Sequence, residues 1–128
     1  MMLHSMQKRH IREVMKMKKI EAIIRPEDLE PVRLALEKKS IVSMTVIEAQ
    51  GRGRQKGISL QWRAGEYRVE FLPKIRIDMV VDDDLVEPAI EAIISVAKTG
   101  RSGDGKIFIY PVEEVIRLST EERGREAI

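Results

Sequence analysis

Residues 75–98 decide the fold, and they read IRIDMVVDDDLVEPAIEAIISVAK. In the first half, apolar residues alternate with Arg76 and Asp78, a pattern typical of a strand with one buried face. In the second half, apolar residues recur at helical spacing up to Gly100, and 82–84 (three aspartates) predict an N-cap and first-turn acids. The helical stripe consists of Val86, Ile90, Ile93 and Ala97. The stretch therefore predicts a strand followed by an amphipathic helix.

The same pattern occurs earlier in the chain, which indicates an internal duplication. Residues 18–24 form the first predicted strand. Its Lys19-Ile20 pair lies 55 positions before Lys74-Ile75, where the strand pattern of 75–81 begins (74 minus 19). Each predicted helix begins with Asp-Leu and carries a proline close behind, Pro31 in one and Pro88 in the other. Proline is tolerated in a helix only within about the first turn. The stripe of the first helix is Leu29, Val32, Ala35 and Leu36.

Two more strands complete the two units. Residues 42–50 alternate and are rich in β-branched side chains, and residues 107–110 form an apolar run before Pro111. Two strand–helix–strand units in one short domain give βαββαβ, the ferredoxin-like plait of the α+β class. Both helices would cover the same face of the sheet. The other face would be open in a monomer, so we expect oligomerisation.

Composition describes an ordinary soluble domain. The chain has 128 residues, of which 43% are hydrophobic and 34% charged, and it has no cysteine. Disulfides and thiolate chemistry are therefore excluded. No apolar run approaches the ~20 residues that span a bilayer, and no apolar signal segment opens the chain. These features predict a cytoplasmic protein.

The positive charge is concentrated at the N-terminus. Residues 1–16 carry four cationic side chains and one acidic side chain, a net of +3. Because the whole chain is +2, residues 17–128 sum to −1. A nucleic-acid-binding domain should carry its basic excess in its folded body, so nucleic acid is not an expected partner. We interpret 1–16 as an extension that is a disordered tail or an artefact of start-codon choice or expression design, with a basic docking helix as the alternative. The folded domain is 17–128.

A long insertion, residues 51–74, separates the two units. It opens with three glycines among cationic and amide side chains, a composition that suits backbone N–H groups and full charges around an anion. Residues 58–66 fit neither a strand nor a helix in pattern. We therefore expect a long loop with an anion-binding base and a mobile tip, and loops of this length tend to be functional.

A second glycine-rich segment, residues 99–106, lies between the second helix and the last strand. Gly103 and Gly105 flank an aspartate and precede Lys106. Alone, this pattern is most often a turn, and it is not a P-loop because it leads into a strand. In the plait it would open near the first glycine segment or face a neighbouring subunit. Two such loops converging would build a phosphate site.

Together these stretches resemble the PII nitrogen-regulatory signal proteins. The matching segments are Met17–Pro26, Met44–Val46, Gly51–Gly57, Glu66–Lys74, Thr99–Phe108 and Pro111–Arg117. The resemblance covers residues 17–128. It implies a homotrimer, not an enzyme, that binds ATP or ADP in clefts between subunits and 2-oxoglutarate beside Mg²⁺ and ATP. The long loop, about 53–71 and called the T-loop in the family, would then control an ammonium transporter or a nitrogen-assimilation enzyme. Contact with a membrane would be indirect, through a channel partner.

The resemblance also implies roles for individual residues. The nucleotide-binding residues would be Ile23, Thr45, Gly51, Gly53, Arg54, Gln55, Lys56, Gly103, Asp104, Gly105, Lys106 and Arg117. The 2-oxoglutarate-binding residues would be Gln55, Lys56, Gly57 and Lys74. Gln55 would also be the protein's ligand to Mg²⁺, together with oxygens of ATP and 2-oxoglutarate. Arg63 would contact the partner, and Tyr67 occupies the position that is nucleotidylated in the family.

The chain departs from the family pattern at four positions. Ser119 stands where a second arginine is frequent, and Glu121 stands at a common glycine, which puts one phosphate contact in doubt. Trp62 replaces a prominent T-loop tyrosine, and Gly65 replaces a serine that some relatives phosphorylate.

Three other readings of the plait remain. A nucleotide-using enzyme is disfavoured because the two histidines, His4 and His10, both lie in the extension and no nucleophile–base pair is evident. An RNA-binding plait would need stacking aromatics on its central strands, which are lacking. An amino-acid-sensing regulatory plait remains open, and it should bind its ligand without ATP.

Overall fold

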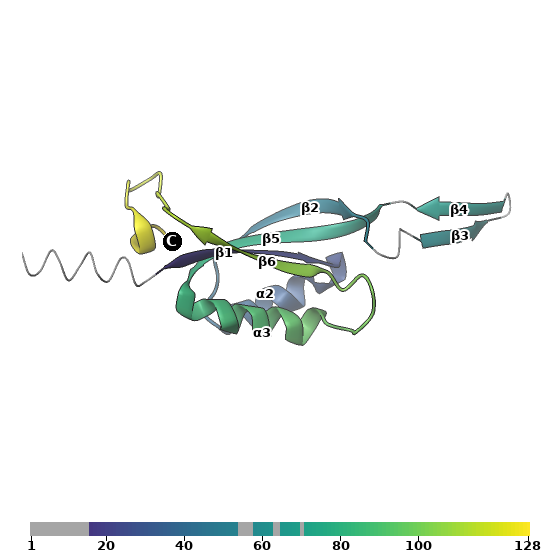
Figure 1. The fold of residues 1–128 in the computed structure, drawn as a ribbon, viewed down its shortest axis with the longest axis horizontal. Coiled ribbons are helices and arrows are strands. Elements are labelled where there is room, and N and C mark those ends of the chain that lie inside the picture. The colour runs from purple at the N-terminus through teal and green to yellow at the C-terminus, as the bar shows by residue number, and fades with distance from the viewer. Residues whose placement is uncertain (1–15, 54–57, 63–64, 70) are drawn as a thin grey trace, which may run out of the picture.

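The computed structural model describes residues 16–53, 58–62, 65–69 and 71–128, with only the backbone described at 58–62 and 65–69. A four-stranded antiparallel sheet, in the order β2-β5-β1-β6, carries two helices on one face (Figure 1). Its strands are β1 (Met17–Ile24), β2 (Thr45–Gly51), β5 (Leu72–Asp82) and β6 (Lys106–Val112). The helices are α2 (Leu29–Glu37) and α3 (Val86–Ala97), and short 3₁₀ turns are η1 (Pro26–Asp28), η2 (Asp83–Leu85) and η3 (Gly124–Ala127). The predicted ferredoxin-like plait is confirmed.

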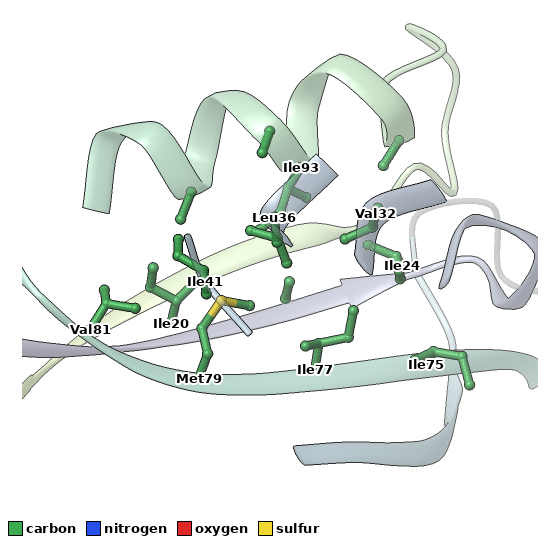
Figure 2. Packing of buried hydrophobic residues seen from close by; sticks show 14 residues of the cluster. Ile20, Ile24, Val32, Leu36, Ile41, Ile75, Ile77, Met79, Val81 and Ile93 are labelled. Atoms are coloured by element: carbon green, nitrogen blue, oxygen red, sulfur yellow. The ribbon is translucent and has the colours of Figure 1, made fainter. Parts of the chain in front are cut away.

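The core lies between the sheet and the helices. β1 is central, so Ile20 is opposite Met79 of β5 on one side and Ile109 of β6 on the other. Figure 2 shows Ile20, Leu36 and the other buried side chains interleaved between the two layers. Complete burial of one such side chain stabilises the fold by about 1.5–3 kcal/mol. The packed core fixes the relative positions of β1, β2, β5 and β6, and therefore of the segments that follow their ends.

The helical stripes agree with the pattern, with one difference on α3. Ile93 and Ala97 are buried as expected, but Ala89 and Ala92 are buried in addition, whereas Ile90 is half-buried. Ile90 instead borders an apolar hollow between α3 and the edge strand β6. Three of the four buried positions of α3 therefore hold alanine, which allows the helix to pack closely on its neighbours.

The prediction of an unstructured long loop is wrong in its middle. Two strands, β3 (Ile58–Trp62) and β4 (Gly65–Val69), pair as an antiparallel hairpin, and Leu60 lies opposite Tyr67 in the register. The signal was the alternation of apolar and polar residues over 58–62, which is typical of a strand. Five residues are too few to identify a strand from alternation alone. The pairing of β3 with β4 is what brings their apolar residues opposite one another.

One strand boundary and one helix-capping role also differ from the prediction. β2 begins at Thr45 rather than residue 42, because the chain turns at Ser40 (φ 66°) and Val42 remains 68% exposed. Asp82 precedes η2 without capping it through its side chain. Its carboxylate instead accepts hydrogen bonds from Arg125 at 2.7 Å.

Among the described residues, no helix or strand covers the sheet face opposite α2 and α3 (Figure 1). Four charged side chains cross its centre, and Arg76 donates to Asp78 at 3.1 Å while Lys19 lies 3.7 Å from the same carboxylate. Phe108 and Tyr110 stay 39% and 43% exposed on β6. An open face of mixed charge and aromatic surface is what the sequence predicts for a chain that associates with further copies.

Candidate functional site

A hollow of about 480 Å³ lies at the end of the sheet from which the β3–β4 hairpin leaves. Both glycine-bearing segments contribute to its wall, and Lys74 lies between them. The lining residues from these segments include Gly51, Gly53, Gly103, Gly105 and Lys106. The hollow is within the ~300–1,000 Å³ typical of small-molecule sites. The two segments therefore converge within one chain.

Strand register explains why the segments meet. Gly51 pairs with Leu72 at the end of the β2–β5 ladder, and Lys106 pairs with Ile23 at the end of the β1–β6 ladder. Since β1 and β5 are neighbours, both ladders finish at the same end of the sheet, where the strands terminate. Gly51 and Lys106, which are 55 positions apart (106 minus 51), thus reach one concave surface.

Gly105 sits where the second segment touches β1. A Cβ built there would lie 1.8 Å from the carbonyl oxygen of Ile23, and the φ angle is +109°. Both the space and the backbone conformation require glycine. Close backbone approach of this kind aligns the segment with the strand it must follow.

Lys74 bridges the two segments. Its ammonium donates a hydrogen bond to the carbonyl oxygen of Gly103 at 2.9 Å, and a Cβ on Gly51 would lie 3.1 Å from its Cγ. Its stem therefore packs on the first segment and its charge reaches the second. An ammonium held at the mouth of a hollow is suited to bind a carboxylate or phosphate.

Arg25 is a residue that the sequence reasoning missed. Its guanidinium donates to the Asp104 carboxylate at 2.8 Å and to the Ser102 carbonyl oxygen at 3.3 Å. It follows β1 directly and precedes Pro26, so the sequence shows only a cation at a strand end. The contact spans 79 positions, and only the folded chain reveals that Arg25 fastens the second glycine segment.

Asp104 organises this segment from within. Its carboxylate accepts hydrogen bonds from the Thr99 hydroxyl, from the Thr99 amide at 2.7 Å and from the Gly100 amide at 2.9 Å. These contacts hold the pKa of Asp104 well below its ordinary value. The Thr99 hydroxyl is the largest cause, and Arg25 and the two amides add to it. Asp104 lines the apolar hollow beside α3, not the hollow of the glycine segments. A carboxylate with these partners shapes the segment.

Several residues expected at the site lie elsewhere or outside the described residues. Arg117 is in the C-terminal segment, which lies at the opposite end of the sheet from the β3–β4 hairpin (Figure 1). Its guanidinium donates to the backbone oxygen of Ile128 at 3.0 Å. Thr45 begins β2, away from the end where Gly51 lies. The remaining residues, Arg54, Gln55, Lys56, Gly57 and Arg63, lie outside the described residues, as does the side chain of Tyr67.

Glu121, one of the departures from the family pattern, occupies a backbone position that suits glycine. Its φ angle is 61°, in the left-handed region that favours glycine, and its amide donates to the Arg117 carbonyl oxygen at 2.8 Å. The turn after Arg117 therefore forms in this chain despite the side chain at a position suited to glycine.

The charges of the hollow suit an anionic ligand. Lys74 and Lys106 both line it, together with Arg52, and Gly51, Gly53 and Gly105 leave room for a ligand to approach the backbone. Within the described ranges, no three acidic or histidine side chains gather as a metal site. Nor does any helix in those ranges have the length and apolar character needed to cross a membrane.

Fold and hollow together define a ferredoxin-like domain with a lysine-lined hollow between two glycine-bearing segments. A family model described as nitrogen regulatory protein P-II matches residues 17–122. The nitrogen regulatory protein P-II of Azospirillum brasilense is 57% identical over 112 residues, covering 88% of this chain and 100% of that protein. The protein of the same name from Pasteurella multocida is 53% identical over the same shares. The chain belongs to the nitrogen regulatory protein P-II family, whose members are regulators and not enzymes.

A solved structure agrees with this assignment. The crystal structure of Arabidopsis thaliana PII bound to citrate superposes with a TM-score of 0.72 at 41% identity, covering 88% of this chain and 92% of that one. The likeness therefore extends over the whole plait.

Proposed function

We propose that this protein is a cytoplasmic homotrimeric sensor that reads ATP, ADP and 2-oxoglutarate and transmits the result through its T-loop. The observation that carries the proposal is the convergence of both glycine-bearing segments and Lys74 on one hollow. Family membership supports a role in nitrogen regulation. The identity of the ligands and partners is the proposed part.

A nucleotide fits the hollow by chemistry. A triphosphate carries several negative charges, and Lys74, Lys106 and Arg52 supply cations around glycine backbone that a phosphate can approach closely. Arg54, Gln55 and Lys56 follow Gly53 directly in sequence and would extend this wall over the phosphates. The apolar parts of the wall, from Ile23, Leu72 and Phe108, suit the base and the sugar.

The effector would be a small dicarboxylate, 2-oxoglutarate, bound beside the phosphates. Lys74 offers its ammonium, and the Arabidopsis PII structure holds citrate, also a small carboxylate. Mg²⁺ would be held by Gln55 and by oxygens of ATP and the effector, as a hard cation prefers. Bound there, Mg²⁺ would neutralise charge between phosphate and carboxylate, which makes effector binding depend on ATP.

The position of Arg117 supports a trimer. In one chain the C-terminal segment that carries Arg117 lies at the far end of the sheet from the β3–β4 hairpin (Figure 1). Only a second copy could bring it to the phosphates, and the same holds for Thr45. The uncovered sheet face with Phe108 and Tyr110 offers the surface for such association.

The T-loop is the proposed output. The β3–β4 hairpin lies beyond the end of the sheet (Figure 1). On either side of it in sequence, Gly53 and Leu72 line the hollow. A ligand that engages Gln55 would therefore bias the placement of the hairpin that carries Arg63 and Tyr67. We propose an ammonium transporter or a nitrogen-assimilation enzyme as the partner, with Arg63 in contact and Tyr67 as the position open to modification.

Calorimetric titration of 2-oxoglutarate, with and without Mg-ATP, tests the proposal. We expect binding only when Mg-ATP is present, and its loss in Gln55→Ala and Lys74→Ala. Lys38→Ala, an exposed residue after α2, is the matched control and should bind normally. ATP binding without any effector response would leave an adenine-nucleotide sensor. Binding of 2-oxoglutarate without ATP would favour the amino-acid-sensing type of plait, and absence of nucleotide binding would overturn the proposal.

A further inference from the structure

We propose that Arg125 and Asp82 form a clamp that fixes the C-terminal segment to the end of β5 and thereby positions Arg117. The inference rests on the proposed function, in which Arg117 of one copy contacts nucleotide phosphates in another. Arg125 is here a positioning residue, since it acts through Arg117 and not on the ligand. Neither member of the pair was expected at the site from the sequence.

The clamp itself has strong geometry. Nε of Arg125 donates to Oδ1 of Asp82 at 2.7 Å, and a terminal nitrogen donates to Oδ2 at 2.7 Å. Both carboxylate oxygens are thus engaged by one planar guanidinium, a bidentate arrangement that fixes direction as well as distance. The contact joins positions 43 residues apart, from the last residue of β5 to the turn η3. It is shorter than the ion pairs inside the segment, 3.9 Å for Arg123–Glu114 and 4.0 Å for Arg117–Glu122.

The segment after β6 folds back on itself and brings Arg117 to the clamp. Ile116 and Arg123 form an antiparallel bridge, and the Arg117 amide donates to the Glu122 carbonyl oxygen at 3.0 Å. The turn η3 follows at Gly124–Ala127, and Ala127 is buried with 7% of its surface exposed. The segment is therefore a small closed loop whose last turn rests on the body of the protein.

Two hydrogen bonds connect Arg125 to Arg117. The Ile128 amide donates to the Arg125 carbonyl oxygen at 3.3 Å, and the Ile128 carbonyl oxygen accepts from the Arg117 guanidinium at 3.0 Å. The side chain of Arg117 is 45% exposed, and its Nε lies 4.0 Å from the Glu122 carboxylate. Its guanidinium is placed by Ile128, and Ile128 by the turn that Arg125 anchors. Without the anchor the segment gains conformational freedom that phosphate binding must then remove.

The test is an ATP titration of the intact protein with Arg125→Gln, which removes the guanidinium and its charge but keeps a polar side chain. We expect ATP to bind about threefold to tenfold more weakly, because the segment that carries Arg117 must then be ordered when ATP binds. In an Arg117→Gln background, the further change Arg125→Gln should have no effect on ATP affinity, because the clamp acts through Arg117. A purely structural role would lower affinity by the same factor in both backgrounds.

Matched variants complete the experiment. Arg123→Gln, a neighbouring exposed arginine with a longer ion pair, should bind ATP as the unmodified protein does. The swapped pair Asp82→Arg with Arg125→Asp should recover part of the affinity, and amide exchange over 115–128 should be faster in Arg125→Gln alone. Light scattering confirms that each variant keeps its assembly state.

The outcomes separate the inference from the proposed function. If Arg117→Gln weakens ATP binding and Arg125→Gln does not, the clamp is refuted and the proposed function stands. If the unmodified protein binds no ATP, or Arg117→Gln has no effect, the proposed function is at fault for this residue and the inference falls with it.

Discussion

Gly105→Ala is the substitution whose consequence the structure specifies most closely. The new Cβ would lie 1.8 Å from the Ile23 carbonyl oxygen, whereas carbon and oxygen ordinarily stay about 3.3 Å apart. The overlap of about 1.5 Å is with backbone, so no side-chain rotation relieves it. The segment must move away from β1.

The magnitude follows from what that movement costs. The φ angle of +109° adds about 1–3 kcal/mol of backbone strain for a residue with a Cβ. A shift of the segment also breaks the hydrogen bond from Lys74 to Gly103, now 2.9 Å, which contributes about 1.5–3 kcal/mol as a bond to a charged group. We expect about 2–4 kcal/mol lower stability, since a shift relieves part of the strain, and at least about tenfold weaker ATP binding.

Gly100→Ala is the matched control. Its φ angle of +85° imposes a similar backbone penalty, but a Cβ there meets nothing within 4 Å. It should therefore cost only about 1–2 kcal/mol and leave ATP affinity close to normal. Denaturant titration at one protein concentration, followed by calorimetry with ATP, gives both quantities. Equal losses of stability and affinity in the two variants would refute the argument from close approach.

Three further predictions follow from the same contacts. Arg25→Ala should weaken ATP binding by loosening the second glycine segment, whereas Arg33→Ala, which removes an exposed pair on α2, should not; unchanged calorimetric affinity in Arg25→Ala would contradict this. Folding lowers the pKa of Asp104, so the ionised carboxylate stabilises the fold fully above its ordinary pKa of 3.8, and this stabilisation is lost as the pH falls below 3.8. The stability of Asp104→Asn should therefore fall less steeply with acid than that of the unmodified protein. Identical pH profiles for the two proteins would contradict this prediction. Glu121→Gly should raise stability by about 0.5–1 kcal/mol, since relief at φ 61° exceeds the entropy that glycine loses on folding, and a lower denaturation midpoint would show that the side chain contributes instead.

Local pattern by itself determined the architecture. Alternation over 75–81 and the helical spacing after it predicted β5 and α3, and the internal repeat extended the prediction to β1 and α2. These features are local, because the periods of strands and helices are written in neighbouring residues. The glycine segments were also evident as composition. Their convergence was left open between one chain and two, and the structure shows it within one chain.

Only the tertiary structure decided the contacts that cross long stretches of sequence. Three hydrogen bonds join positions 79, 29 and 43 residues apart. They run from Arg25 to Asp104, from Lys74 to Gly103 and from Arg125 to Asp82, in that order. Asp82 shows the difference: in sequence it opens a helix as a capping residue, and in space its carboxylate is taken by an arginine from the far end of the chain. A hydrogen bond depends on which surfaces the packed core brings together, and the period of a strand or helix carries no information about that.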